Sequence, residues 1–257
     1  MINWDNFIFF AFSALFCWIL ASFFAIKSKE KSSIAILLHS LGIFIYTFFI
    51  IGFWIYIERP PLRTLGETRL WFVFFLSIIS LLIYLFWHFK LIFSFTTVLS
   101  AVFILINIFK PEIHNKELMP ALQSFWFIPH VVTYMFSYAF LGTSFLLTLY
   151  HLFRKKSTLL PYFDDLVRIG WASFSIAMFL GALWAKEAWG IFWDWDPKET
   201  WALLTWLLYL IYLLYRKTYP SSIKKSLLII VLAFIFLQLC WYGVNYLPTP
   251  EKSLHAY

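Results

Sequence analysis

The residues best suited to chemistry form one tryptophan-rich segment, residues 186–201, which reads KEAWGIFWDWDPKETW. Four tryptophans fall within positions 189–201 and alternate with charged side chains. Such a segment is too apolar for bulk water and too charged for a bilayer core, so we expect it to lie at a membrane–water interface. Tryptophan faces could hold a large flat aromatic ligand, but an aromatic belt at the membrane surface also gathers tryptophans. Spacing alone leaves both interpretations open.

Two local patterns concern the helices next to this segment. Asp196 is suited to cap the first N–H groups of a helix, and Pro197 to occupy its first position, so a helix start is predicted there. On the other side, small residues recur every four positions and predict the close approach of another helix: Ser173, Ala177, Gly181 and Ala185. We interpret this stripe of small residues as a packing feature without chemistry.

The composition indicates a polytopic membrane protein that is entirely α-helical. Of the 257 residues, 62% are hydrophobic and only 13% are charged, whereas a soluble domain carries about 25% charged residues. Backbone groups in lipid must be hydrogen-bonded internally, so apolar stretches that cross the membrane are helices. About eight such stretches are expected, over residues 6–26, 34–57, 70–88, 91–109, 130–153, 167–185, 200–215 and 226–245.

The charge distribution predicts the orientation of these helices. The loops after the first, third, fifth and seventh stretches hold 12 of the 20 basic and three of the 13 acidic residues. Because cytoplasmic loops are enriched in lysine and arginine, we expect those loops inside and both chain termini outside. No basic residue precedes the first stretch, so it is expected to be a helix rather than a cleaved signal peptide. The net charge of +7 is then a topology signal and requires no nucleic-acid partner.

No linker, charge run or internal repeat divides the chain. We therefore expect a single membrane domain over residues 1–257, with residues 186–201 as an external loop at the interface. Cys17 and Cys240 lie in separate apolar stretches without CxxC spacing, and are expected to be small buried side chains rather than a redox pair. The eight glycines form no nucleotide-binding motif.

The tryptophan-rich segment resembles the WWD motif of the haem-handling proteins of cytochrome c maturation. The resemblance is carried by Trp189, Gly190, Trp193 and the run from Trp195 to Ala202. Its Pro-Lys-Glu-Thr-Trp form is similar to the CcsA (ResC) branch of the system II synthetase, while the related CcmC and CcmF proteins share the tryptophans. The similarity extends from about His130 to the C-terminus and is less clear over the first 100 residues.

The resemblance implies an external haem site. It assigns His130 and His255 as axial ligands of the haem iron, and imidazole is a common ligand of haem iron. The predicted topology places both histidines and the loop on the same outer face. The implied haem-binding residues are Trp189, Gly190, Trp193, Trp195, Asp196, Pro197, Lys198, Glu199, Thr200 and Trp201. Outward cations that could pair with the haem propionates are Arg59, Arg63, Arg69, Lys186 and Lys198.

The implied function is haem delivery and attachment, with haem b as the bound substrate. Haem would be presented to the CxxCH thiols of an apocytochrome c, and this chain would supply position and electrostatics without a catalytic side chain. Any enzymatic role would be that of a cytochrome c synthetase (haem lyase) subunit. Expected partners are a CcsB (ResB)-type membrane protein, a thioredoxin-like thiol reductant and the lipid bilayer. We expect a bacterial cytoplasmic membrane, with a plastid thylakoid membrane as the alternative.

The sequence departs from the family at one position. Many CcsA-type chains have a histidine within the seventh helix, where this chain has Leu214. His39 is the first candidate for a substitute inner-side ligand, because an ionisable residue inside a membrane suggests a function. The alternative is a histidine bonded to a neighbouring helix. His88 and His151 are interpreted as interface residues, and His114 as part of a solvated loop.

Three other functions compete with haem attachment by system II. A CcmC- or CcmF-like role in the other maturation system would differ in its partners. A b-type subunit for quinone-linked electron transfer would need paired histidines on facing helices, and no helix here carries such a pair. A solute transporter would show polar residues at the membrane midplane, whereas the polar chemistry here lies in outer loops.

Overall fold

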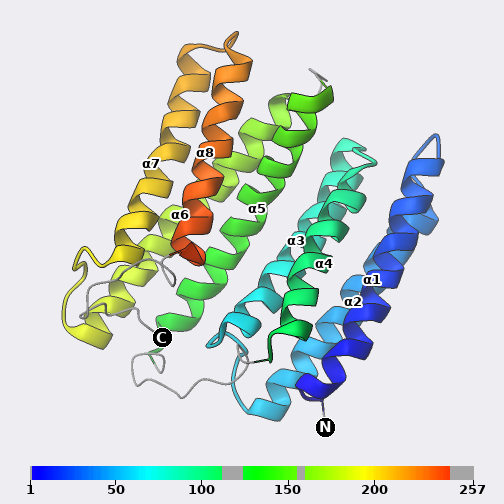
Figure 1. The fold of residues 1–257 in the computed structure, drawn as a ribbon, viewed down its shortest axis with the longest axis horizontal. Coiled ribbons are helices and arrows are strands. Elements are labelled where there is room, and N and C mark those ends of the chain that lie inside the picture. The colour runs from blue at the N-terminus through cyan, green and yellow to red at the C-terminus, as the bar shows by residue number, and fades with distance from the viewer. Residues whose placement is uncertain (1, 112–123, 155–159, 244–257) are drawn as a thin grey trace. The chain divides into compact units, whose positions relative to one another are not determined.

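The computed structural model describes residues 2–111, 124–154 and 160–243, which form eight helices (Figure 1). No strand occurs in these three ranges, and the all-α prediction is confirmed. Seven of the described helices are long and apolar enough to cross a membrane, and α7 is the helix outside that set. The multi-pass character is therefore confirmed, while the orientation of the termini stays a prediction.

The helices group into two compact units, residues 1–118 and 119–257, and each unit is described by itself. Unit 1 contains α1 (Trp4–Lys27), α2 (Ser33–Ile57), α3 (Leu65–Trp87) and α4 (Ile92–Phe109). Helix α1 packs on α2 and α4, and α3 packs on α4 and α2. His88 ends α3 in the left-handed conformation, with φ 56°, which produces the tight turn expected before α4. That the two units form a single membrane domain stays a prediction.

Unit 2 contains α5 (Phe127–Arg154), α6 (Leu160–Trp189), α7 (Pro197–Thr218) and α8 (Ile223–Trp241). The most extensive packing is between α5 and α6, followed by α7 with α8. Successive helices run in opposite directions, so α5 and α7 begin where α6 and α8 end (Figure 1). We call this the loop end of unit 2, because residues 190–196 connect α6 to α7 there.

Helix α5 comes close to α6 at two glycines, Gly181 of the predicted stripe and Gly170, which lies outside it. A Cβ atom added at Gly170 would lie 2.6 Å from Cδ2 of Leu141, and one added at Gly181 would lie 2.5 Å from Cε1 of His130. Both distances are shorter than carbon atoms tolerate, so a larger residue would displace the neighbour. At Gly170 the neighbour is the end of a flexible leucine side chain, whereas at Gly181 it is a rigid ring. The sequence predicts a packing role for this stripe, but at Gly181 its packing partner is His130, a predicted haem ligand.

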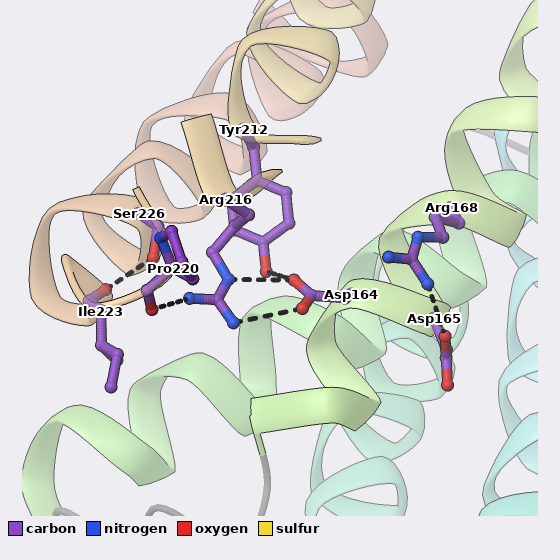
Figure 2. Close-up of polar contacts among 8 residues, drawn as sticks. All are labelled: Asp164, Asp165, Arg168, Tyr212, Arg216, Pro220, Ile223 and Ser226. Carbon is purple, nitrogen blue, oxygen red and sulfur yellow. Dashed lines mark hydrogen bonds and ion pairs between the residues drawn. The ribbon is translucent and has the colours of Figure 1, made fainter. Parts of the chain in front are cut away.

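The other end of unit 2 is held by an ion pair between α6 and α7 (Figure 2). Asp164 accepts hydrogen bonds from Nε and a terminal nitrogen of Arg216, each at 3.2 Å, and from the hydroxyl of Tyr212 at 2.6 Å. Figure 2 also shows the neighbouring pair of Asp165 and Arg168, which joins successive turns of α6 at 3.1 Å and is exposed. The Asp164 cluster, not this local pair, ties the two helices together.

Candidate functional site

Residues 186–190 fix the exit of the chain from α6. The backbone turns at Gly190 with φ 83°, a conformation that favours glycine. Nζ of Lys186 donates to the carbonyl oxygen of Gly190 at 2.7 Å and lies 5.3 Å from the ring centroid of Phe192. Lys186, expected as a propionate partner, therefore already has two contacts within its own loop.

The predicted helix start at residues 196–197 is confirmed. Asp196 caps α7 by accepting from the backbone N–H of Lys198 at 3.0 Å, and Pro197 occupies the first helical position. Glu199 completes a capping box, since its Oε2 accepts from the backbone N–H of Asp194 at 2.8 Å and of Asp196 at 3.3 Å. These two carboxylates therefore hold the loop in shape.

The tryptophans of the segment take different positions. Trp195 has φ 56°, is 67% exposed, and meets the half-buried Trp193 edge-on at 6.0 Å. Trp189 meets Trp184, five residues earlier in α6, at 4.7 Å. Trp201 packs on Phe236 of α8 at 5.2 Å and so belongs to the α7–α8 interface. Among the predicted tryptophans, Trp195 is thus the one whose ring is mostly exposed on the loop.

His130 lies one turn into α5, at the loop end, and is held against α6. Its Nδ1 is 2.9 Å from the carbonyl oxygen of Ala177. Because a carbonyl oxygen can only accept, Nδ1 carries the proton and the lone pair of the neutral ring is on Nε2. The ring stacks on Trp184 with centroids 5.5 Å apart and an interplanar angle of 27°, and Tyr134 meets it edge-on at 4.8 Å.

Trp184 connects His130 with the tryptophan-rich loop. One indole contacts both the imidazole of His130 and the indole of Trp189. A second link runs through polar groups, since Oγ of Ser124 donates to Oε2 of Glu187 at 2.7 Å. The start of α5 and the end of α6 are therefore joined by an aromatic contact and by a hydrogen bond. His255, the other predicted ligand, lies outside the described residues, as does His114.

The profile of the family described as Cytochrome C assembly protein matches residues 7–250. The chain belongs to the cytochrome c assembly protein family. Curated relatives named cytochrome c biogenesis protein CcsA are 31% identical in Pelargonium hortorum, over 90% of this chain and 86% of the relative, and 30% identical in Trieres chinensis, over 96% and 93%. A CcsA of Morus indica is 30% identical over 79% of each chain. The resemblance to the CcsA branch is thereby confirmed, with a role in cytochrome c biogenesis.

In unit 1 of this cytochrome c assembly protein, His39 is 1% exposed and bonded to α3. Its Nε2 lies 3.0 Å from the carbonyl oxygen of Ser77 and 2.9 Å from Oγ of Ser80, and its ring stacks on Phe93 at 4.0 Å. Nδ1 has no hydrogen-bond partner among the described residues. This arrangement matches a histidine bonded to a neighbouring helix, and iron ligation by His39 stays a prediction.

The position that departs from other CcsA-type chains faces outward. Leu214 is 56% exposed, whereas Tyr212, two residues earlier, is fully buried and bonded to Asp164. The buried polar side chain at this level of α7 is therefore a tyrosine committed to the ion pair at the end of unit 2 opposite the loop.

The three arginines predicted as propionate partners belong to unit 1 of this family member. Arg59 forms two hydrogen bonds of 2.8 Å to the carboxylate of Glu67, which also accepts from the backbone N–H of Arg63 at 2.7 Å. Burial, followed by the charge of Arg59, lowers the pKa of the Arg63 guanidinium, and Glu67 opposes this. Arg69 is buried. The segment that holds Arg59 and Arg63 is thus a structured turn built around the carboxylate of Glu67.

Three residues of α6 surround His130 and are not predicted from the sequence as parts of the site. The sequence indicates only a packing role for Ala177 and Gly181 and no role for Trp184. Their i, i+4 and i+3 spacing places them on one helix face. That spacing was the available signal, because a face with two small residues and one indole can receive a ring from a neighbouring helix.

Proposed function

We propose that the chain binds haem at the loop end of unit 2 and presents it for covalent attachment to an apocytochrome c. The observation that carries this proposal is the geometry of His130. Its Nδ1–H bond to Ala177 leaves the lone pair on Nε2, and Trp184 links its ring to the first tryptophan of the loop. Histidines that bind metals usually donate their other N–H to a backbone carbonyl or a carboxylate, as His130 does.

The exposed apolar side chains of the loop support a flat ligand. Trp195, Phe192 and Ile191 are all exposed at the loop end. The capping box holds the backbone beneath Trp195 in a fixed shape, so a ring system could bind without ordering the loop first. We propose His130 and His255 as the axial ligands, with residues 189–201 supplying the surface around the macrocycle.

The chemistry of attachment would come from the haem and the thiols. In each thioether bond, a cysteine sulfur adds to one carbon of a vinyl group and its hydrogen goes to the other, so the addition itself needs no oxidant. The chain would hold the haem b edge toward the CxxCH segment and exclude competing orientations. In that role it would act as a synthetase subunit without a nucleophile of its own.

We propose the partners that the resemblance to CcsA-type proteins implies. They are a CcsB (ResB)-type membrane protein, an apocytochrome c and a thioredoxin-like reductant that keeps the CxxCH thiols reduced. The named relatives favour this system over a CcmC- or CcmF-like role. We propose a bacterial cytoplasmic membrane as the location, with the thylakoid membrane as the alternative, and the outer face as the working face.

Haem attachment in reconstituted vesicles tests the proposal. The chain, a CcsB-type partner, haem and a reduced apocytochrome with one CxxCH motif would be combined, and covalently bound haem measured. We expect His130→Ala and His255→Ala to lower the yield at least tenfold. His151→Ala is the matched control, because this histidine lies on the same helix near its other end. Equal yields from His130→Ala and the parent would refute the proposal.

A further inference from the structure

We propose that Ala177, Gly181 and Trp184 form a socket on α6 that sets the plane of the His130 imidazole and thereby its bond to haem iron. The inference rests on the proposed function, since it concerns how the proposed ligand is positioned. None of the three residues belongs to the motif through which the chain resembles its family.

The first wall of the socket is the carbonyl oxygen of Ala177. In an α-helix this oxygen accepts from the N–H four residues later, which here belongs to Gly181. Its second lone pair accepts from Nδ1 of His130 at 2.9 Å. The bond fixes the tautomer of the ring and one of its two rotational settings, because a flipped ring would present carbon at this place.

The second wall is the backbone of α6 at Gly181, where the absence of a side chain leaves space for the imidazole. A Cβ atom there would lie 2.5 Å from Cε1 and 2.7 Å from Nδ1 of His130. The contacted atoms belong to a ring that is already confined, so alanine would displace the imidazole from α6 and stretch its bond to Ala177. Glycine at this position is therefore required by the ring and not by the backbone of α6.

The third wall is Trp184, which is buried and nearly parallel to the imidazole. Tyr134 meets the ring edge-on at 4.8 Å and limits its rotation. Because Trp184 also contacts Trp189, a rotation of the imidazole would disturb the first tryptophan of the loop. The ligand plane and the loop are therefore coupled through one indole.

The consequence is spectroscopic as well as functional. The hydrogen bond at the ring nitrogen that does not bind iron tunes how strongly the imidazole donates to the metal. The position of the ring also sets the angle at which the imidazole lies over the haem. A displaced ring should bind iron more weakly and at another angle. Partners of this kind typically change metal affinity by about 10- to 100-fold when they are removed.

The test compares two glycine variants of α6 in the haem-loaded chain, purified with its CcsB-type partner. Gly181→Ala disturbs His130, whereas Gly170→Ala disturbs Leu141 and Phe140 at the same helix pair without contacting His130. Absorbance and electron paramagnetic resonance report the ligation of the haem iron. We expect Gly181→Ala to lose low-spin haem or shift its g values, to regain low-spin absorbance with free imidazole, and to bind haem at least tenfold more weakly. Gly170→Ala should keep the parent spectrum.

Two outcomes would overturn the socket: a parent spectrum in Gly181→Ala, or the same spectral change in Gly170→Ala. If Gly181→Ala does not fold, Trp184→Phe takes its place, because it keeps a stacked ring but removes the larger indole surface. A shifted g value is expected in Trp184→Phe, and an unchanged one would refute the proposed effect of Trp184 on the imidazole plane.

His130→Ala separates the two proposals. If it keeps the parent spectrum, haem ligation itself is wrong; if it loses the spectrum while Gly181→Ala does not, only the socket is wrong.

Discussion

Sγ of Cys240, near the end of α8, donates to the main-chain carbonyl oxygen of Lys198, in the first turn of α7, at 3.6 Å. The same sulfur accepts from the hydroxyl of Tyr138 on α5 at 3.9 Å. One thiol therefore connects α5, α7 and α8 at the start of α7, where the tryptophan-rich loop ends. Both cysteines are buried, as predicted, but Cys240 is also a hydrogen-bonding group.

Replacement of this thiol should loosen the start of α7. We expect Cys240→Val to lower the free energy of unfolding by about 1–2 kcal/mol, because the Tyr138 hydroxyl would lose its partner in a buried place. Thermal unfolding of the detergent-solubilised chain would measure the change. Cys17→Val is the control, since Cys17 is a buried thiol of unit 1. The same loss in both variants would show that the bonds to Cys240 contribute nothing.

The N-cap of α7 should decide the rigidity of the loop. Removal of a capping aspartate costs about 0.5–2 kcal/mol, so Asp196→Ala should destabilise the chain and speed proteolytic cleavage within residues 190–196. Asp196→Asn should behave like the parent, because asparagine caps about as well. Asp194→Ala is the control, an exposed acid of the same loop. If Asp194→Ala speeds cleavage as much as Asp196→Ala, charge rather than capping holds the loop.

The ion pair at the end opposite the loop should matter more than its neighbour. Asp164→Asn weakens bonds to both Arg216 and Tyr212, which are mostly buried, and should cost about 1–3 kcal/mol. Asp165→Asn affects only the exposed pair with Arg168 and should cost at most about 0.5 kcal/mol. Melting temperatures of the two variants would show the order, and the reverse order would contradict the assignment of the cross-helix contact.

His39 should prove to be a packing residue of unit 1. His39→Ala removes a ring stacked on Phe93 and bonded to α3, so we expect a stability loss of about 2–4 kcal/mol by the cost of core truncations. Haem bound per folded chain should be unchanged. The measurement is haem absorbance normalised to the folded fraction. Loss of the haem band in this variant alone would instead assign an inner-side ligand to His39.

Much of the fold follows from the sequence because lipid leaves few choices. Runs of apolar residues must be helices, and Asp196-Pro197 marks the start of α7 to the residue. The predicted and observed boundaries differ most where polar residues extend a helix beyond the apolar run, as in α6, which begins at Leu160 rather than near 167. The backbone hydrogen bonds of a helix can continue beyond the hydrocarbon core of the membrane. Hydropathy locates only the apolar part of such a helix.

The contacts of individual side chains in the site were harder to predict than the position of the loop. The motif located the loop, but contacts between helices decide which tryptophan faces solvent and which packs inside. Trp201 packs on Phe236 and Trp195 is exposed, although both are tryptophans of one motif. The role of Gly181 depends on a ring that is 51 residues earlier in the chain. Sequence spacing shows that one helix face carries small side chains. It does not show which side chain of a neighbouring helix packs into the space they leave.

The central claim is that His130 binds the haem iron, and the spectrum of the purified chain tests it most directly. The parent, His130→Ala and His151→Ala would each be purified from haem-replete cells together with a CcsB-type partner. The parent and His151→Ala should show the same low-spin haem spectrum, and His130→Ala should lose it and regain it when free imidazole is added. A parent-like spectrum in His130→Ala, or no haem in the parent, would contradict the proposed site.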